Sequence, residues 1–185
     1  IIAAFGTTAV AGYGVAIRLI MFFLLPAWGL SNAVATLVGQ NLGAQQPDRA
    51  ERSVWTTAKY NTVFMVIVTL IFLVLAEPIV HFMNKDAGVE AYAVQALQVM
   101  SFGYIFYGVG MVMINAFNGA GDTRTPTVIN VFCFWLFQIP LAYLLALVIG
   151  LGPKGVFLAV LISEMAISIA GVIIFRKGRW KAVKI

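Results

Sequence analysis

One acidic side chain lies in the middle of a long apolar segment, where a charge is most costly. Glu164 is about ten residues from the start of the apolar segment that ends before Arg176, and a helix rises about 1.5 Å per residue, so its carboxyl group would lie near the midplane of a bilayer. An acid at that depth faces a protein-lined cavity and pairs with another group, or it stays protonated. Glu164 is therefore a candidate proton or cation site, and a structural hydrogen bond between helices is the alternative.

Two further charges interrupt apolar segments, Arg18 in the first and Glu77 near the end of the second. Arg18 is expected at a depth similar to that of Glu164. We hypothesise that Arg18 pairs with Glu164 or with Glu77, and that the choice between them changes as the helices move. A static pair, or an Arg18 side chain that reaches toward the outer headgroups, is the alternative.

Prolines and amides inside the apolar segments are candidate hinge or cavity residues. Pro140 should open its helix and free a backbone carbonyl close to Gln138, and Pro26 should do the same in the first helix. Both are candidate bending sites, although kinked packing without motion also explains them. Asn115 is a cavity candidate whose default role is a hydrogen bond between helices.

The sequence does not support enzymatic chemistry. No Ser, Cys or Thr has a histidine and an acid at a suitable spacing, and the single histidine, His81, cannot form a metal site alone. Cys133 is the only cysteine, so no intrachain disulfide forms. We expect neither an enzyme nor a metal or organic cofactor.

Five charge-poor apolar segments must position these residues. A membrane-spanning helix needs about 20 apolar residues, and lipid admits only helices or closed barrels. Hydrophobic residues make up 62% of the 185 residues and charged residues only 10%. The sequence therefore predicts an all-α, polytopic membrane bundle with helices at about residues 9–44, 60–83, 89–121, 125–151 and 155–176.

The basic residues predict an orientation. The net charge of +5 is concentrated beside helix ends and does not form a face with interleaved aromatic residues, so nucleic acid is not an expected partner. By the positive-inside rule, the richer side is cytoplasmic, which places the C-terminus in the cytoplasm. The richer side has nine lysines and arginines and the other side has two, namely Arg49, Arg52, Lys59, Arg124, Arg176, Lys177, Arg179, Lys181 and Lys184 against Lys85 and Lys154.

The connecting segments predict local structure. Ala50, Val54 and Ala58 recur at helical spacing, which predicts a short helix lying at the cytoplasmic interface over residues 47–58. Asp86 is placed to cap the third helix, and Asp122 to close the turn that follows it. The apolar start, residues 1–5, is expected to be the exit of an earlier helix.

Two segments resemble motifs of the multidrug and toxic compound extrusion (MATE) family. Residues 26–44 read PAWGLSNAVATLVGQNLGA and resemble the family's "P..G...A...LVGQNLGA" helix and turn. Residues 115–126 read NAFNGAGDTRTP and resemble its "GAGDTR.P" turn. The resemblance covers nearly the whole chain and implies the second lobe of a two-lobed, twelve-helix transporter of the inner (cytoplasmic) membrane. Residues 1–185 would then be a C-terminal bundle that lacks the N-terminal helices of its parent chain.

This resemblance implies that the protein exports small amphipathic, often cationic, compounds by alternating access, in exchange for protons or sodium ions. Some sodium-coupled members carry acids in helices seven and ten, yet residues 91–121, the match to helix ten, contain no acid. Proton coupling is therefore expected over sodium coupling. The alternatives are a flippase for lipid-linked saccharides, which should show several basic residues in its cavity, and a membrane scaffold without transport activity.

Overall fold

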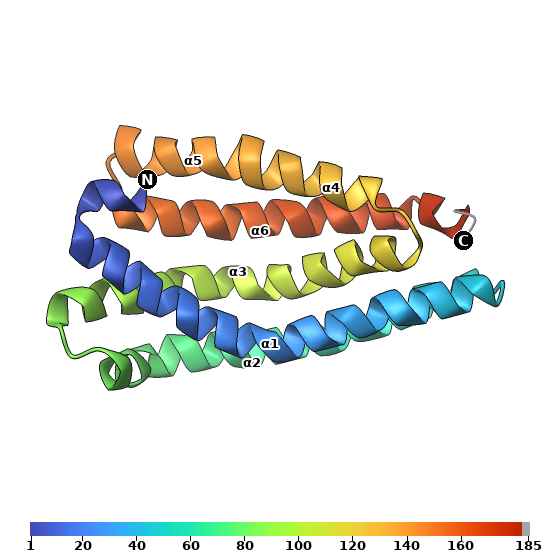
Figure 1. Cartoon of the computed structure of the whole chain (residues 1–185), viewed down its shortest axis with the longest axis horizontal. Helices are drawn as coiled ribbons and strands as arrows, with labels where there is room; N and C mark the ends of the chain where they lie inside the picture. The colour runs from blue at the N-terminus through green and yellow to red at the C-terminus, as the bar shows by residue number, and fades with distance from the viewer. Residues whose placement is uncertain (183–185) are drawn as a thin grey trace.

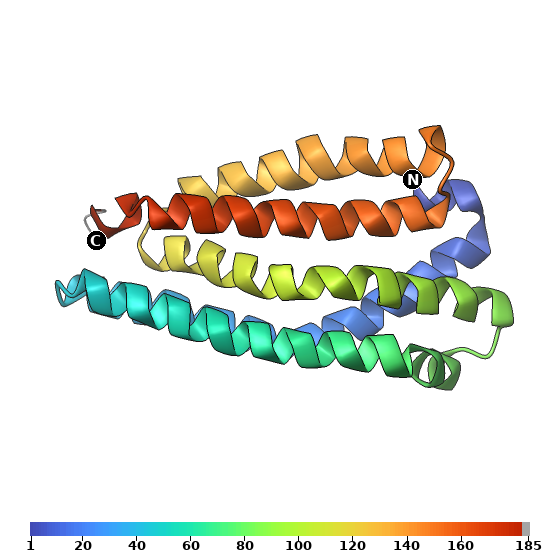
Figure 2. The same ribbon diagram turned by 180° about the vertical axis from the view of Figure 1, so that it is seen from behind.

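Five long helices form an elongated bundle in the computed structural model, which describes residues 1–182 (Figures 1 and 2). Each span is long and apolar enough to cross a membrane. The spans are α1 (Thr7–Gly43), α2 (Pro47–Met83), α3 (Ala87–Gly119), a fourth span over Arg124–Val148 and α6 (Pro153–Arg176). Short 3₁₀ helices, η1 (Ile2–Phe5) and η4 (Arg179–Ala182), flank the bundle. The predicted all-helical fold with five spans is confirmed.

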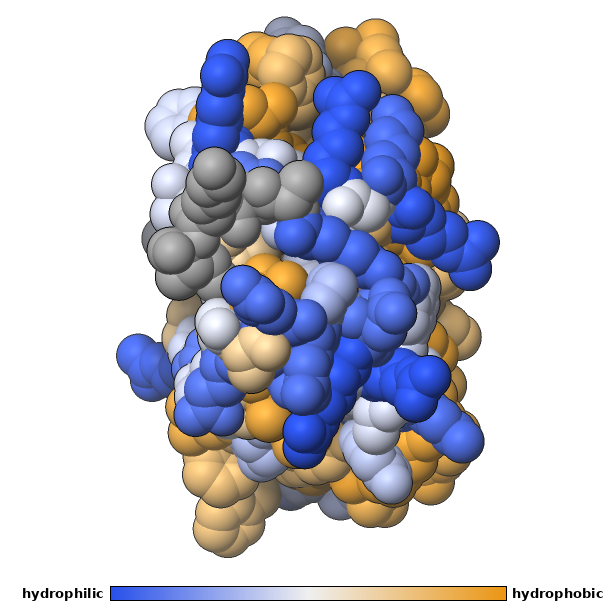
Figure 3. Space-filling model, turned by 90° about the vertical axis from the view of Figure 1, so that its right-hand side faces the viewer, coloured by the Kyte–Doolittle hydropathy of each residue, from blue (hydrophilic) through white to orange (hydrophobic). Residues whose placement is uncertain are grey.

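The connections alternate between the two ends of the bundle. The α1–α2 turn, the α3–α4 turn and η4 lie at one end, and the α2–α3 turn and the turn before α6 lie at the other (Figure 1). Viewed from the first end, hydrophilic residues gather over the middle of the face (Figure 3). We call this the basic end, because Arg49, Arg52, Arg124, Arg176, Lys177, Arg179 and Lys181 lie in or beside its turns. Lys184 lies outside the described residues.

Helix α2 corrects one prediction, the separate interfacial helix over residues 47–58. The structure shows one helix over Pro47–Met83 with no break. The stripe that begins at Ala50, Val54 and Ala58 continues through Asn61 and Met65, and all five are buried. No proline or glycine lies between Ala50 and Met65, so the helix continues through this stretch. Its buried residues recur every three to four positions and therefore form one face, which packs against protein along the whole stripe.

Helix α3 is the centre of the bundle and contacts α1, α2 and α6. Lipid provides little hydrophobic drive between helices, so close packing of small residues is needed to hold them together. At the basic end Gly119 meets α1 closely, since a Cβ atom there would lie 2.7 Å from the Cα of Ala35. A Cβ at Gly39 would lie 3.2 Å from the carbonyl oxygen of Gly119. The two motif segments that resemble the transporter family are therefore packed against each other.

Asp86 caps α3, and Asp122 bonds across the turn between α3 and α4, each in its predicted place. The Oδ1 atom of Asp86 accepts hydrogen bonds from the backbone N–H groups of Gly88, at 2.9 Å, and Val89, at 3.0 Å. Asp122 accepts from the backbone N–H of Thr125 at 3.0 Å and from its hydroxyl at 2.6 Å. Both aspartates accept from N–H groups that a helix start leaves without a partner within the helix.

The fourth span departs from α-helical geometry on both sides of Pro140. It consists of α4 (Arg124–Asn130), a π-helical segment η2 (Val131–Gln138), α5 (Ile139–Tyr143) and a second π-helical segment η3 (Leu144–Val148). Proline lacks the N–H that an α-helix requires, and a π-helix makes wider turns. The helix is therefore widened on both sides of Pro140, while Ile139–Tyr143 around the proline itself is α-helical.

Candidate functional site

The carboxyl group of Glu164 lies in a cavity of about 170 Å³ between α3, the fourth span and α6. The side chain is half-buried in the bundle. Polar groups reach this cavity from three elements, Tyr107 on α3, Asn130 on α4 and Glu164 on α6. The remaining lining is Gly110, Met111, Ile114, Phe134 and Ile167. The site thus combines one acid with two neutral hydrogen-bonding groups inside an apolar wall.

Glycines on α3 bring α6 close on both sides of Glu164. A Cβ atom at Gly103 would lie 3.3 Å from the Cα of Leu161, and one at Gly110 would lie 3.4 Å from the Cα of Ser168. The two contacts are separated by about two helical turns on each helix. Glu164 lies between them on α6, so the close packing fixes the position of the acid relative to α3.

Tyr107 links the cavity to α1. The indole Nε1 of Trp28 donates a hydrogen bond to the hydroxyl oxygen of Tyr107 at 3.1 Å. Because indole is only a donor, Tyr107 must accept this bond, and its own O–H remains available as a donor. The cavity therefore holds a hydroxyl donor, an amide and a carboxyl group, which suits the binding of a proton or of a cationic or hydrogen-bonding ligand.

The expected pairing of Arg18 with an acid is not formed in this conformation. Arg18 and Glu77 are exposed, and among residues 1–182 no ion pair includes Arg18, Glu77 or Glu164. The cavity around Glu164 has no basic residue in its lining. Glu77 lines a separate groove, which the Glu164 side chain does not line.

The other candidate residues have distinct surroundings. The amide nitrogen of Asn115 donates to the hydroxyl of Ser31 at 2.7 Å and joins α3 to α1, as expected for an interhelical hydrogen bond. The Oε1 atom of Gln138 is buried without a partner, next to Pro140. Pro26 lies inside α1, which remains one helix and bends near its middle (Figure 1). None of these four residues lines the Glu164 cavity.

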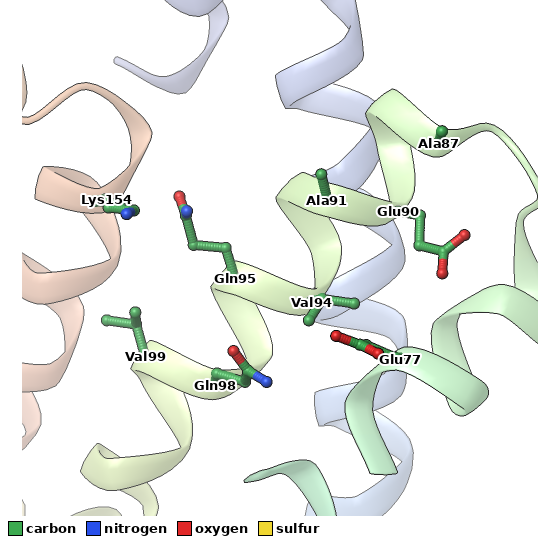
Figure 4. Close-up of a pocket in the computed structure, with 9 residues that line it drawn as sticks. All are labelled: Glu77, Ala87, Glu90, Ala91, Val94, Gln95, Gln98, Val99 and Lys154. Atoms are coloured by element: carbon green, nitrogen blue, oxygen red, sulfur yellow. The ribbon is translucent and has the colours of Figure 1, made fainter. Parts of the chain in front are cut away.

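A second, larger groove opens at the end opposite the basic end (Figure 4). It has a volume of about 670 Å³, and its lining includes Glu77, Glu90, Gln95, Gln98 and Lys154. The groove could not be predicted from the sequence, because its lining comes from three helices, with Glu77 on α2, three residues on α3 and Lys154 on α6. One of the two acids in the groove has a partner. The Nδ1 atom of His81 lies 3.0 Å from the carboxylate of Glu90.

At the basic end, the segment after α6 folds back on the bundle. Trp180 is fully buried, stacks on Phe175 with ring centroids 4.7 Å apart, and donates its indole N–H to the carbonyl of Phe175. The ammonium group of Lys181 lies 2.6 Å from Glu51 and 3.2 Å from Asp48. The hydrogen bond with Glu51 raises the pKa of Lys181. We call Trp180 and Lys181 the C-terminal strap, because they connect α6 to the start of α2.

Comparison with known proteins gives the family. The MatE family model matches residues 1–144 of the 185. The chain belongs to the MatE family. This MATE chain is 28% identical over 185 residues to the probable multidrug resistance protein YpnP of Bacillus subtilis, covering all of this chain and 41% of YpnP. It is 28% identical over 163 residues to the FAD transporter of Shewanella oneidensis, covering 88% of this chain and 36% of that protein.

Solved MATE structures have the same fold. The Vibrio cholerae MATE transporter VcmN in its bent form superposes with a TM-score of 0.88 at 22% identity, covering 95% of this chain and 40% of VcmN. The chain thus spans about two fifths of the length of the relatives it matches. Its family consists of membrane transporters and not of enzymes, and the MATE chain is a multi-pass membrane protein.

Proposed function

We propose that this chain is the C-terminal five-helix bundle of a twelve-helix exporter that moves small amphipathic, often cationic, compounds across the inner membrane by alternating access. Family membership, the multidrug resistance relative and the partial coverage of longer transporters support this proposal. The observation that carries it is the Glu164 cavity, an acid near the bilayer midplane that has no basic partner.

We further propose that the coupling ion is a proton and that Glu164 binds it. A single carboxyl group beside neutral Tyr107 and Asn130 can hold a proton, whereas a sodium site requires several oxygen ligands. Helix α3 carries no acid from Ala91 to Gly119, which argues against a second carboxylate from this helix. The absence of lysine and arginine from the cavity lining also argues against a flippase that binds lipid-linked phosphates.

Transport by the complete protein tests the proposal. In proteoliposomes with an imposed pH gradient, uptake of tetraphenylphosphonium, a lipophilic cation, should fall at least about tenfold for Glu164→Gln, which removes the titrating group. Glu164→Asp should retain part of the activity. Asp48→Asn, which changes an exposed acid at the basic end, is the matched control and should transport like the parent. Full pH-driven transport by Glu164→Gln would refute the role of Glu164.

The basic end is proposed to face the cytoplasm, because its turns hold most of the lysines and arginines. In a Cys133→Ser background, Lys85→Cys should react with a membrane-impermeant thiol reagent added to intact cells, and Lys177→Cys should not. The reverse pattern would show that the orientation is inverted.

A further inference from the structure

The groove opposite the basic end contains two opposite charges without partners. Glu77 from α2 and Lys154 from α6 both line it, and among residues 1–182 neither takes part in an ion pair. Glu90, the other acid in the groove, is engaged by His81. Near a membrane surface an unpaired charge is tolerated where water or a complementary ligand satisfies it.

Glu77 and Lys154 do not satisfy each other because they lie on opposite sides of the groove (Figure 4). Between them α3 presents two amides, with Gln95 on the side of Lys154 and Gln98 on the side of Glu77 (Figure 4). The groove therefore has an acidic half and a basic half, each with an amide beside the charge. A ligand that carries both a cation and an anion would complement both halves at once.

Beyond the groove, toward the middle of the bundle, the surfaces of α2 and α3 are apolar. On α3 the stripe that begins with Gln95 and Gln98 continues to Phe102, which is exposed. On α2 the face that ends in Glu77 continues toward the middle through exposed aliphatic residues, namely Val63, Ile67, Leu70 and Val74. This change from charged to apolar matches an amphiphile whose head lies at the membrane surface and whose chains run along the helices.

We propose that this groove binds the headgroup of a zwitterionic, amine-bearing phospholipid, phosphatidylethanolamine, from the surrounding bilayer. The primary ammonium of the headgroup donates hydrogen bonds to the Glu77 carboxylate and to the amide oxygen of Gln98. Its phosphate accepts from the Lys154 ammonium and from the amide nitrogen of Gln95. The acyl chains lie beside Phe102 and Val74. This site does not depend on the transport role of Glu164, which faces a different cavity.

Native mass spectrometry of the complete protein tests the site, with phosphatidylethanolamine, phosphatidylcholine and phosphatidylglycerol added separately. Phosphatidylethanolamine should be retained about tenfold more strongly than the other two, because only it offers both an anion and N–H donors. Glu77→Gln should remove that preference, because it removes the acceptor for the ammonium group. Lys154→Gln should weaken retention of all three lipids, because they share the phosphate that Lys154 contacts. The conservative Glu77→Asp and Lys154→Arg should keep the preference, and Lys85→Gln, a charge at the same end outside the groove, should leave binding unchanged.

Two further measurements test whether the acyl chains contribute to binding. Phe102→Ser should weaken binding of the lipid, while soluble glycerophosphoethanolamine should not compete at the same concentration, because it lacks the acyl chains. Equal retention of the three lipids, a preference for phosphatidylglycerol, or an unchanged preference in a folded Glu77→Gln protein would overturn the proposal. Competition by the soluble headgroup would also overturn it, since the site would then bind a small zwitterion and not a lipid.

Discussion

Lys181 shows how one residue fixes the end of the bundle. Its ammonium group bridges two acids on the first turns of α2, and the adjacent Trp180 is buried against α6. A lysine whose pKa is raised in the folded state holds its proton more tightly there. Its contribution to stability is therefore complete below the unfolded pKa, about 10.4, and is lost as the pH rises through the folded value. The hydrogen bond between Lys181 and Glu51 also lowers the pKa of Glu51, so this ion pair should be present at neutral pH and be lost both in strong alkali and in acid.

Replacing Lys181 should loosen the strap without unfolding the bundle. Exposed ion pairs contribute about 1 kcal/mol or less, so Lys181→Met should speed hydrogen exchange of the amides in η4 up to about fivefold at neutral pH. The Lys177→Met variant is the matched control, because Lys177 is exposed and has no ion pair among the described residues. Unchanged exchange in Lys181→Met, or an equal change in the control, would show that the ion pairs do not hold η4.

Several buried polar residues could not be identified from sequence. The amide of Asn61 donates to the carbonyl of Gly108 at 3.0 Å, and the hydroxyl of Thr69 donates to the carbonyl of Ser101 at 2.8 Å. Both bonds join α2 to α3 and satisfy groups that lipid would leave without partners. Neutral polar residues of this kind are common in membrane helices, and only the packing shows which of them bond across helices.

The partners of the charged residues inside the apolar segments were harder to predict than their depth. The position of Glu164 near the middle of its helix follows from its residue number alone, and in the structure Glu164 lines a cavity. The depth of a residue follows from the helical rise, but its direction around the helix does not. For this reason the sequence suggested that Arg18 pairs with an acid, whereas Arg18 is exposed and lies outside the cavity lining.

At the scale of elements, the close approach of α1 and α3 depends on Gly119. A Cβ atom at this position would overlap the backbone of Ala35, which cannot move like the end of a flexible side chain. Gly119→Ala should therefore destabilise the protein by about 2 kcal/mol and lower its melting temperature in detergent. Gly29→Ala in α1 is the control, because a Cβ atom at Gly29 would have no neighbour within 4 Å among the described residues, its own helix backbone aside. Equal melting temperatures for the two variants would contradict this account of the packing.

The helices themselves were largely predictable, because membrane spans are long and apolar. The boundaries of four spans fall within a few residues of those expected from hydropathy. The error at α2 arose where the helix continues past the apolar core, since a charged amphipathic stretch gives the same pattern whether it lies on lipid or packs on protein. Ala50 and Val54 are fully buried, which only the positions of the other helices could reveal.

For the fourth span, the sequence indicated a departure from α-helical geometry but not how many residues it covers. Pro140 indicated a local opening of the helix, yet π-helical turns cover Val131–Gln138 and Leu144–Val148, far beyond the proline. The buried Oε1 of Gln138, which has no partner, adds to the polar character of this region. Whether Pro140 and Pro26 act as hinges remains a hypothesis about motion, and the bend in α1 is consistent with it (Figure 1).

For the whole molecule, two polar features lie in different parts of the bundle. The Glu164 cavity is enclosed by α3, the fourth span and α6, and the larger groove opens at the end opposite the basic end. We propose proton binding for the first and lipid binding for the second. The assignments are independent, since Glu77 and Lys154 do not line the Glu164 cavity.

Proton release on substrate binding tests the central claim, that Glu164 carries the proton exchanged for the exported compound. The complete protein in weakly buffered detergent solution is mixed with tetraphenylphosphonium, and released protons are measured with a pH-sensitive dye. We predict that the parent releases up to about one proton for each bound cation, and that Glu164→Gln binds the cation but releases none. Proton release by Glu164→Gln equal to that of the parent would contradict the account.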